Sequence, residues 1–232
     1  MRAFLKSPGL ECLIAIFLFA VLAGCAAPPS AQSDQAGEGD VIMLPAPLLE
    51  GPISLEEAIL GRRSVRAYGD QPLSLGEISQ LLWAAQGVTD PRGFRTAPSA
   101  GALYPLELYI VLPEGVYHYE ESVHQLTSIQ GGDVRADLCQ AALGQDAVRE
   151  APAVVVVTAV YARTVSKYGS ERGPQYVHLE AGHAAQNLLL QAVCLELGAV
   201  PIGAFYDQQV QEVLGIPADH QPLYLIPVGH PE

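Results

Sequence analysis

The chain has 232 residues, of which 50% are hydrophobic and 16% are charged, and its formal net charge is −13 at pH 7. This length and apolar content suit one globular domain with a sizeable core. The negative charge argues against nucleic acid as a partner, because neutralising phosphates requires a basic surface. It also disfavours adhesion to anionic lipid through charge alone.

The N-terminus has the pattern of a targeting segment. Arg2 and Lys6 give it a positive start, and residues 13–22 form an unbroken apolar run that is too short for a comfortable transmembrane span. The run ends in Leu-Ala-Gly-Cys, which resembles a bacterial lipobox. That resemblance implies cleavage before Cys25, lipidation of Cys25 and attachment to a membrane by acyl chains. An uncleaved membrane anchor is the alternative.

These signals predict three segments. Residues 1–24 are expected to be a lipoprotein signal peptide, and residues 25–50 the lipidated cysteine and a flexible tether rich in Pro, Ala and Gly. The folded domain is expected over 51–232. Ala26 follows the cysteine, where an aspartate would resemble an inner-membrane retention signal. We therefore expect an exported protein anchored in the cell envelope, by default at the outer membrane of a Gram-negative cell.

Two cysteines remain in the folded domain. Cys139 and Cys194 both lie in apolar, helix-like runs, so buried small hydrophobic residues are the favoured interpretation. A disulfide between them stays open, because spacing alone does not establish a pairing. The sequence has no zinc-type spacing of Cys or His, and no metal site is expected.

Helix and strand patterns alternate through the folded domain. Capping-box patterns beginning at Ser54 and Ser74 predict helices over 55–61 and from 75 to near Gly87. The further predicted elements are a strand at 108–112, a hairpin with arms at 116–119 and 124–126, a helix over 134–143, a central strand at 153–160, a long helix over 175–197, a strand at 199–204, a helix over 207–214 and a strand at 223–228. This order predicts an α+β fold, an α/β sandwich with a central mixed sheet flanked by helices.

A basic cluster follows the first predicted helix. Alternate residues of an extended segment point to the same side, so Arg62, Ser64 and Arg66 present two guanidiniums and a hydroxyl together. Arginine binds phosphate bidentately through a planar fork of donors. The pattern therefore predicts a phosphate site, with Arg63 as a further candidate. A surface cluster that pairs with the acidic surface is the alternative.

A second motif consists of small residues, Pro98, Ser99, Ala100 and Gly101. Small side chains allow a backbone to lie closely against a flat ring. Together with the basic cluster, this motif indicates a planar cofactor that carries a phosphate.

These two motifs resemble the FMN-dependent nitroreductase family, and most of all its SagB/ThcOx dehydrogenase branch. The resemblance covers residues 55–231. It implies a nitroreductase-like fold, FMN as cofactor and a homodimer in which each flavin lies at the interface. It also implies that the basic cluster holds the phosphate and ribityl chain, and that the small-residue motif lies against the flavin ring.

Two further elements follow from the same resemblance. It implies that Pro201, Ile202 and Gly203 form a turn whose backbone donors lie near flavin N5 and the pyrimidine edge. His230 stands after the last strand, where many relatives carry a basic residue that reaches the phosphate. We expect His230 to donate a hydrogen bond there instead.

Lys167 and Tyr168 precede the long predicted helix, and in the resembled branch the matching pair is implicated in azoline oxidation. A desolvated lysine can act as a base and a tyrosine can relay a proton, so one proton would leave to this pair while a hydride goes to the flavin. An exposed loop lysine beside a packing tyrosine is the alternative.

The sequence therefore predicts an FMN-dependent oxidoreductase that moves a hydride between flavin and an organic substrate. The substrate class is a small molecule or a modified peptide, and the resemblance suggests azoline-type oxidation. Because NAD(P)H is cytoplasmic, an exported enzyme is expected to pass its electrons to oxygen or a quinone-linked acceptor. The alternative is a non-catalytic flavin- or ligand-binding lipoprotein on the same fold.

Overall fold

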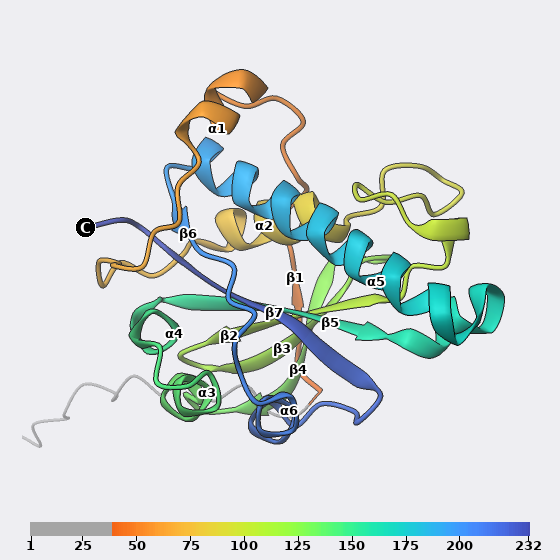
Figure 1. Ribbon diagram of the computed structural model, residues 1–232. Helices are drawn as coiled ribbons and strands as arrows, with labels where there is room; N and C mark the ends of the chain where they lie inside the picture. Colours follow the sequence, from red (N-terminus) through yellow and green to blue (C-terminus); the bar gives the residue numbers. More distant parts are fainter. Residues whose placement is uncertain (1–38) are drawn as a thin grey trace, which may run out of the picture. The chain divides into compact units, whose positions relative to one another are not determined.

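The computed structural model describes residues 39–232, so the expected signal peptide, Cys25 and the first part of the tether lie outside the described residues. The described chain forms a seven-stranded sheet in the order β1-β4-β3-β2-β5-β7-β6, and each pair of neighbouring strands is antiparallel. Helices cover both faces of this sheet (Figure 1). The expected α+β class is confirmed.

The strands are β1 (Val41–Met43), β2 (Leu106–Leu112), β3 (Gly115–Glu120), β4 (Gln125–Gly131), β5 (Ala153–Val160), β6 (Gly198–Ala199) and β7 (His220–Gly229). The helices are α1 (Leu55–Gly61), α2 (Leu75–Gln86), α3 (Arg135–Ala141), α4 (Asp146–Glu150), α5 (Tyr161–Cys194) and α6 (Asp207–Leu214), with a short 3-10 turn η1 (Ala100–Ala102). Both expected capping boxes are present, at Ser54 and Ser74.

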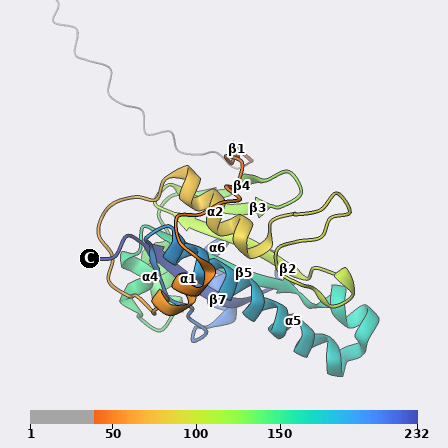
Figure 2. The same ribbon diagram turned by 90° about the horizontal axis from the view of Figure 1, so that it is seen from above.

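The central strand β5 divides the core into two layers. Its side chains alternate between the faces of the sheet. Val155 and Val157 join the core beneath α2 and α5, whereas Val154 and Val156 join the core shared with α3, α4 and α6. Figure 2 shows that α2 and α5 cover one face of the sheet. Burial on both faces is the reason that this strand is an unbroken apolar run in the sequence.

The folded domain begins earlier than expected. β1 pairs with β4 at the edge of the sheet, and Leu44 is buried. The side-chain amide of Gln80 then accepts a hydrogen bond from the backbone N–H of Leu48 at 2.8 Å and donates one to its carbonyl at 3.0 Å. The expected boundary at Gly51 is therefore wrong. A three-residue edge strand has too few residues to show a period in the sequence.

The long helix also differs from the prediction of 175–197. α5 begins at Tyr161, turns at Gly169 (φ 76°, ψ 170°) and continues through Pro174. Glycine and proline are the breakers that hid its first part in the sequence. Gly198, the residue after the expected helix end, begins the two-residue strand β6. The expected parallel component of the sheet is a single bridge outside the paired strands, between Ser64 and Ala199.

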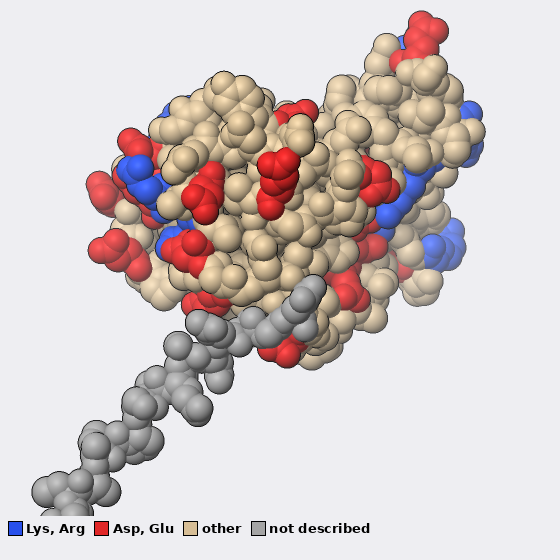
Figure 3. All heavy atoms as spheres, turned by 90° about the horizontal axis from the view of Figure 1, so that it is seen from below, with Lys and Arg blue, Asp and Glu red and all other residues tan. Residues whose placement is uncertain are grey.

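Surface and side-chain chemistry add three observations. Cys139 and Cys194 are both free thiols. No helix within residues 39–232 is both long and apolar enough to cross a membrane. Acidic side chains are scattered among neutral ones on the face seen from below, and basic side chains lie mainly near its edges (Figure 3).

Candidate active site

The basic motif is fixed against the edge of the sheet. Ser64 pairs in parallel with Ala199, and the N–H of Val65 donates to the carbonyl of Ala199 at 3.1 Å. This approach requires Gly198, because a Cβ there would lie 2.6 Å from the side chain of Val65. Buried Tyr68 donates its hydroxyl to the carbonyl of Val65 at 2.7 Å. The segment that carries the basic side chains therefore has a defined position beside β6.

Among residues 39–232, the guanidiniums of this motif have no carboxylate partners. Ten Lys and Arg side chains lie between residues 39 and 232, and five of them form ion pairs with Asp or Glu. The other five are Arg62, Arg63, Arg66, Lys167 and Arg172. In so acidic a chain, a cluster that merely balanced surface charge would be paired. The alternative of a cluster that pairs with the acidic surface therefore has no support among the described residues.

Arg63 differs from its neighbours. Its guanidinium donates to the carbonyls of Leu60 at 2.9 Å and Arg62 at 2.7 Å, at the end of α1. It therefore satisfies helix-terminal carbonyls, which is a common role for a basic side chain there. The half-buried Arg62 and the exposed Ser64 and Arg66 remain the free donors of the motif.

The turn at residues 201–203 begins two residues after Ala199, the residue that pairs with Ser64 of the basic motif. Ile202 exchanges two backbone hydrogen bonds with Leu225, at 2.8 and 2.9 Å, which fixes the turn against β7. Pro201 is half-buried, and a Cβ on the exposed Gly203 would meet open space. Gly203 is therefore the residue of this turn that presents its backbone at the surface.

His230 lies beside this group. Its carbonyl accepts a hydrogen bond from the N–H of Gly69 at 2.9 Å. Its ring nitrogen Nε2 lies 3.5 Å from a carboxylate oxygen of Glu77 and has no hydrogen-bond partner within residues 39–232. The ring is therefore directed at Glu77, with one nitrogen weakly engaged.

The small-residue motif forms a separate, tightly turned loop. Gly101, Ala102 and Tyr104 all have positive φ, at 65°, 53° and 44°. Such angles cost energy for a non-glycine residue and persist where the surroundings enforce them. The hydroxyl of Ser99 accepts a hydrogen bond from the N–H of Tyr104 at 2.9 Å and so closes the loop.

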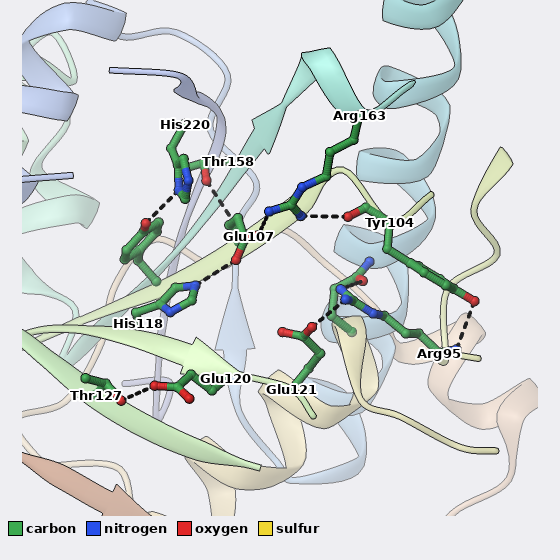
Figure 4. A network of polar contacts seen from close by, with 12 residues as sticks. Arg95, Tyr104, Glu107, His118, Glu120, Glu121, Thr127, Thr158, Arg163 and His220 are labelled. Atoms are coloured by element: carbon green, nitrogen blue, oxygen red, sulfur yellow. Dashed lines mark hydrogen bonds and ion pairs between the residues drawn. The ribbon is translucent and has the colours of Figure 1, made fainter. Parts of the chain in front are cut away.

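Two arginines hold Tyr104, as Figure 4 shows. The guanidinium of Arg95 stacks 4.6 Å from the centroid of its ring and forms an ion pair with Glu121. Arg163, in the first turn of α5, donates to the carbonyl of Tyr104 at 2.9 Å and pairs with Glu107 at 2.5 Å. The loop is thereby tied both to the hairpin and to the start of α5.

Glu107 is the fixed charge of this arrangement. Burial raises its pKa, but hydrogen bonds and charge from His118 and Arg163 outweigh burial and lower the pKa of Glu107 to about 2. The ring of His118 lies 2.7 Å from the second carboxylate oxygen. Glu107 therefore remains ionised over the ordinary pH range and clamps Arg163, which lies one helical turn before Lys167.

Lys167 and Tyr168 meet the small-residue loop. A methyl group on Gly101 would lie 2.7 Å from Nζ of Lys167 and 2.8 Å from the hydroxyl oxygen of Tyr168. Tyr168 packs edge-on against Tyr176, with centroids 4.9 Å apart. The structure thus brings together a strained small-residue loop, an amine and a phenol, which the sequence places far apart.

The sequence interpretation missed Glu180. This residue of α5 is 2% exposed, and burial raises its pKa to about 7 against the opposing effects of a hydrogen bond with Ser99 and the charge of Arg95. Its Oε1 atom has no hydrogen-bond partner in the described chain. A signal was present, because Glu180 stands on the same helical stripe as the buried Val177 and Ala181.

The predicted residues form two half-sites within one chain. Along α5, Glu180 lies near Ser99 of the loop, whereas Val193 lies beside Gly61, next to the basic motif. At 1.5 Å per residue these contacts are about 20 Å apart along the helix. No hydrogen bond or ion pair joins the two half-sites in the described part of the chain. One half-site holds the basic motif, the 201–203 turn and His230, and the other holds the loop with Lys167 and Tyr168.

Residues 39–232 contain no cluster of three or more His, Cys, Asp or Glu suited to a metal ion.

Comparison with known proteins identifies the family. Residues 59–230 match the model of the nitroreductase family. The chain is 47% identical over 197 residues to a Methanocaldococcus jannaschii protein named as a nitroreductase, covering 82% of this chain and 98% of that one. It is 24% identical over 223 residues to the trifolitoxin operon protein TfxC of Rhizobium leguminosarum, covering 87% of this chain and 62% of that one.

Solved structures support the same family assignment. A nitroreductase structure from Ralstonia eutropha superposes with a TM-score of 0.75 at 32% identity, covering 83% of this chain and 90% of that one. The NADPH:FMN oxidoreductase of Vibrio harveyi has a TM-score of 0.58 at 24% identity, covering 77% and 69%, and so shares the fold. The fold and family together define an oxidoreductase. This chain belongs to the nitroreductase family.

Proposed function

We propose that this protein is an FMN-dependent oxidoreductase that moves a hydride between flavin and an organic substrate. The observation that carries the proposal is the contact of Gly101 with Lys167 and Tyr168. It sets two proton-transferring side chains beside a loop with almost no side-chain bulk. The names of the nitroreductase and FMN oxidoreductase relatives support the same chemistry.

The residues present fit FMN. Arg62, Ser64 and Arg66 are unpaired donors that would hold the phosphate and the ribityl chain. Gly101 leaves no room for a Cβ, so the loop offers its backbone to a flat ring. FMN, when bound, supplies the hydride acceptor and donor. The turn at 201–203 would orient the cofactor through the backbone N–H of Gly203.

Lys167 and Tyr168 would handle the proton that accompanies the hydride. Lys167 has no carboxylate partner within residues 39–232, and its amine is therefore free to meet substrate. Tyr168 supplies a hydroxyl on the same side of the loop. An amine and a phenol so arranged serve as base and relay.

We further propose that two copies of the chain complete each site. The half-sites of a single chain are separated along α5, and a cavity of about 390 Å³ lies between them. It is lined by Ala58 of α1, by Thr96 before the loop and by Asn187 of α5. Large apolar side chains are exposed around it, at Leu48, Leu49, Leu55, Ile59 and Leu60. A second copy in a two-fold arrangement would cover this surface and supply the missing half-site twice.

Mixing two variants tests this arrangement, at an FMN concentration low enough that the Arg66→Ala protein by itself is left without cofactor and is inactive. Arg66→Ala damages the first half-site and Lys167→Met the second. If each site uses both chains, the mixed dimer has one intact site, and random mixing restores about a quarter of wild-type activity. No recovery, with mixed dimers demonstrated by mass, would contradict the shared site.

The substrate proposal is narrower. We propose a SagB-type dehydrogenation of a small molecule or a modified peptide, and the similarity to a protein of the trifolitoxin operon is consistent with a substrate made by a dedicated operon. We also propose lipidation at Cys25, export and attachment to the envelope, with oxygen or a quinone-linked acceptor receiving the electrons. The mass of the mature N-terminal peptide tests lipidation. Robust turnover with NADPH, and none with any organic donor, would contradict the oxidation of an organic substrate.

Replacing the side chains of Lys167 and Tyr168 distinguishes an enzyme from a protein that only binds flavin. Lys167→Met and Tyr168→Phe should lower turnover by about 10²–10⁴-fold while FMN stays bound, since acid–base groups contribute factors of that size. Arg172→Met is the matched control, because Arg172 is another unpaired cation of α5. If neither site variant changed any measured reaction, a non-catalytic binder would be the better account.

A further inference from the structure

The ring of His230 lies next to the carboxylate of Glu77, in the half-site that holds the basic motif. Nε2 of His230 is 3.5 Å from Oε1 of Glu77, and the two side chains are 23% and 18% exposed. No residue between 39 and 232 forms a hydrogen bond with this ring, although Nε2 is buried. The two nitrogens of an imidazole point in divergent directions, so Nδ1 is turned away from the carboxylate.

Glu77 is held in place by its role as a helix cap. It is the third residue of α2, and its Oε2 atom accepts hydrogen bonds from the backbone N–H and the hydroxyl of Ser74, at 2.6 and 2.7 Å. This capping box leaves the other oxygen, Oε1, for the ring of His230. The direction of the carboxylate is therefore fixed by α2 and not by the histidine.

His230 is held from the other side, by the segment that continues the basic motif. Its carbonyl accepts a hydrogen bond from the N–H of Gly69 at 2.9 Å, and Tyr68 forms an antiparallel bridge with Pro231. These contacts lie two and three residues beyond Arg66 in the sequence. The ring of His230 thus stands between a fixed carboxylate and the candidate phosphate site.

The number of protons on the ring decides which groups it can serve. A neutral imidazole has one N–H, whereas an imidazolium donates from both nitrogens. If Nε2 donates to Glu77, a neutral ring offers only the lone pair of Nδ1 to a phosphate oxygen. The imidazolium is the one form that donates to the carboxylate and to a phosphate together.

We propose that His230 binds the cofactor phosphate as an imidazolium between that phosphate and Glu77, taking up a proton from solvent when the phosphate binds. Glu77 is the positioning residue, which aims the ring and balances its charge. This inference rests on the proposed FMN site. It gives the site a cation in addition to Arg62 and Arg66, one that forms together with the bound cofactor.

The other charged and titratable groups around the ring do not replace Glu77. They are on the paired segment and at the chain end, at Arg66, Tyr68, Asp70 and Glu232. Neither acid among them forms an ion pair with His230 in the described chain. The Tyr68 hydroxyl donates to two backbone carbonyls. The charge of Arg66 opposes a second cation in the empty site, and a bound phosphate removes that opposition.

Calorimetry measures the proton directly. FMN is titrated into the flavin-free full-length protein in two buffers of different ionisation enthalpy, between pH 7.5 and 9. The second pKa of a phosphate group is about 6, so the FMN phosphate contributes little in this range. The wild type should take up at least about 0.5 proton per FMN at its maximum. By linkage, its affinity for FMN should fall about 3- to 10-fold per pH unit there.

Three variants assign the proton. His230→Asn keeps a neutral donor and takes up no proton, so the uptake should vanish. Glu77→Gln keeps the helix cap, because glutamine also serves in a capping box. Its amide nitrogen would face Nε2, which disfavours the imidazolium, so the uptake should vanish here too. Glu57→Gln, in the matching capping box of α1, should keep the wild-type uptake.

The outcomes separate the inference from the function on which it rests. A wild type without proton uptake, or equal uptake in wild type and His230→Asn, would overturn the inference alone. Loss of uptake in His230→Asn but not in Glu77→Gln would overturn the role of Glu77. If Glu77→Gln fails to fold, His230→Asn carries the test. Absence of FMN binding by the wild type would overturn the proposed function as well.

Discussion

Gly101 and Lys167 approach so closely that one added methyl group on the glycine would come within 2.7 Å of the lysine Nζ. Gly101 also has φ of 65°, which an alanine adopts at a cost of about 1 kcal/mol. Gly101→Ala should therefore lower the melting temperature by about 2–4 °C. It should reduce turnover by up to about 100-fold, because Lys167 and Tyr168 are displaced from the reacting position.

Gly76→Ala is the control for that substitution. Gly76 lies in the first turn of α2 with no positive φ and no close neighbour. It should leave both stability and turnover near the wild-type values. A Gly101→Ala protein with normal turnover would show that the contact with Lys167 has no role in catalysis.

The basic motif should control cofactor affinity. Arg66→Ala removes an unpaired, exposed guanidinium, and a charge-assisted hydrogen bond at such a site is worth about 1.5 kcal/mol, or roughly tenfold in the dissociation constant of FMN. The loss should shrink as salt concentration rises. Arg149→Ala, which removes an ion-paired arginine of α4, should bind FMN normally. Equal affinities for all three proteins would place the phosphate elsewhere.

Arg163 should position the part of α5 that carries Lys167, without touching the cofactor. It joins the carbonyl of Tyr104 to Glu107 from the first turn of α5. Its partly exposed pair is worth about 1 kcal/mol, so Arg163→Met should lower the melting temperature by about 2–4 °C. Turnover should fall while FMN affinity changes by less than about twofold. Weakened FMN binding with unchanged turnover would contradict a positioning role.

Glu107 and Glu180 should give opposite dependences of stability on pH. The pKa of Glu107 is lowered to about 2, so its stabilising effect is complete above its usual pKa of 4.5 and is lost as pH falls from 4.5 toward 2. Thermal melts should show the wild type losing stability relative to Glu107→Gln in that window. A constant difference in melting temperature would argue against an ionised Glu107.

For Glu180 the sign reverses. Burial raises its pKa to about 7, so the protonated folded form is favoured at low pH and the advantage is lost as pH rises from 4.5 through 7. The melting temperature of the wild type should fall relative to Glu180→Gln across that range. A wild type that instead loses stability relative to Glu180→Gln as pH falls would mean that Glu180 is stabilised as a carboxylate.

The sequence predicted local elements best where a local signal defines them. Both capping boxes involve contacts three residues apart, and the β-branched run of β5 is buried on both faces. β1 and the first part of α5 were missed because their causes are not local. β1 exists through its pairing with β4, and α5 continues past Gly169 because its second part packs on the sheet core.

The candidate site shows the same difference between features with a local sequence signal and features that depend on the fold. The motifs were recognisable from residue type, but their grouping was not. That Gly101 meets Lys167, and that Ser64 meets Ala199, depends on the path of α5 and β6. Glu180 was visible only as a charge on an apolar stripe, and its burial beside the small-residue loop required the fold.

An absorption spectrum of the purified protein, with the released cofactor identified by mass, tests the central claim most directly. The account predicts a yellow protein that releases FMN in a one-to-one ratio with the chain, or that takes up added FMN to that ratio. A colourless protein that fails to take up FMN would contradict the claim, and the two half-sites would then need a different ligand.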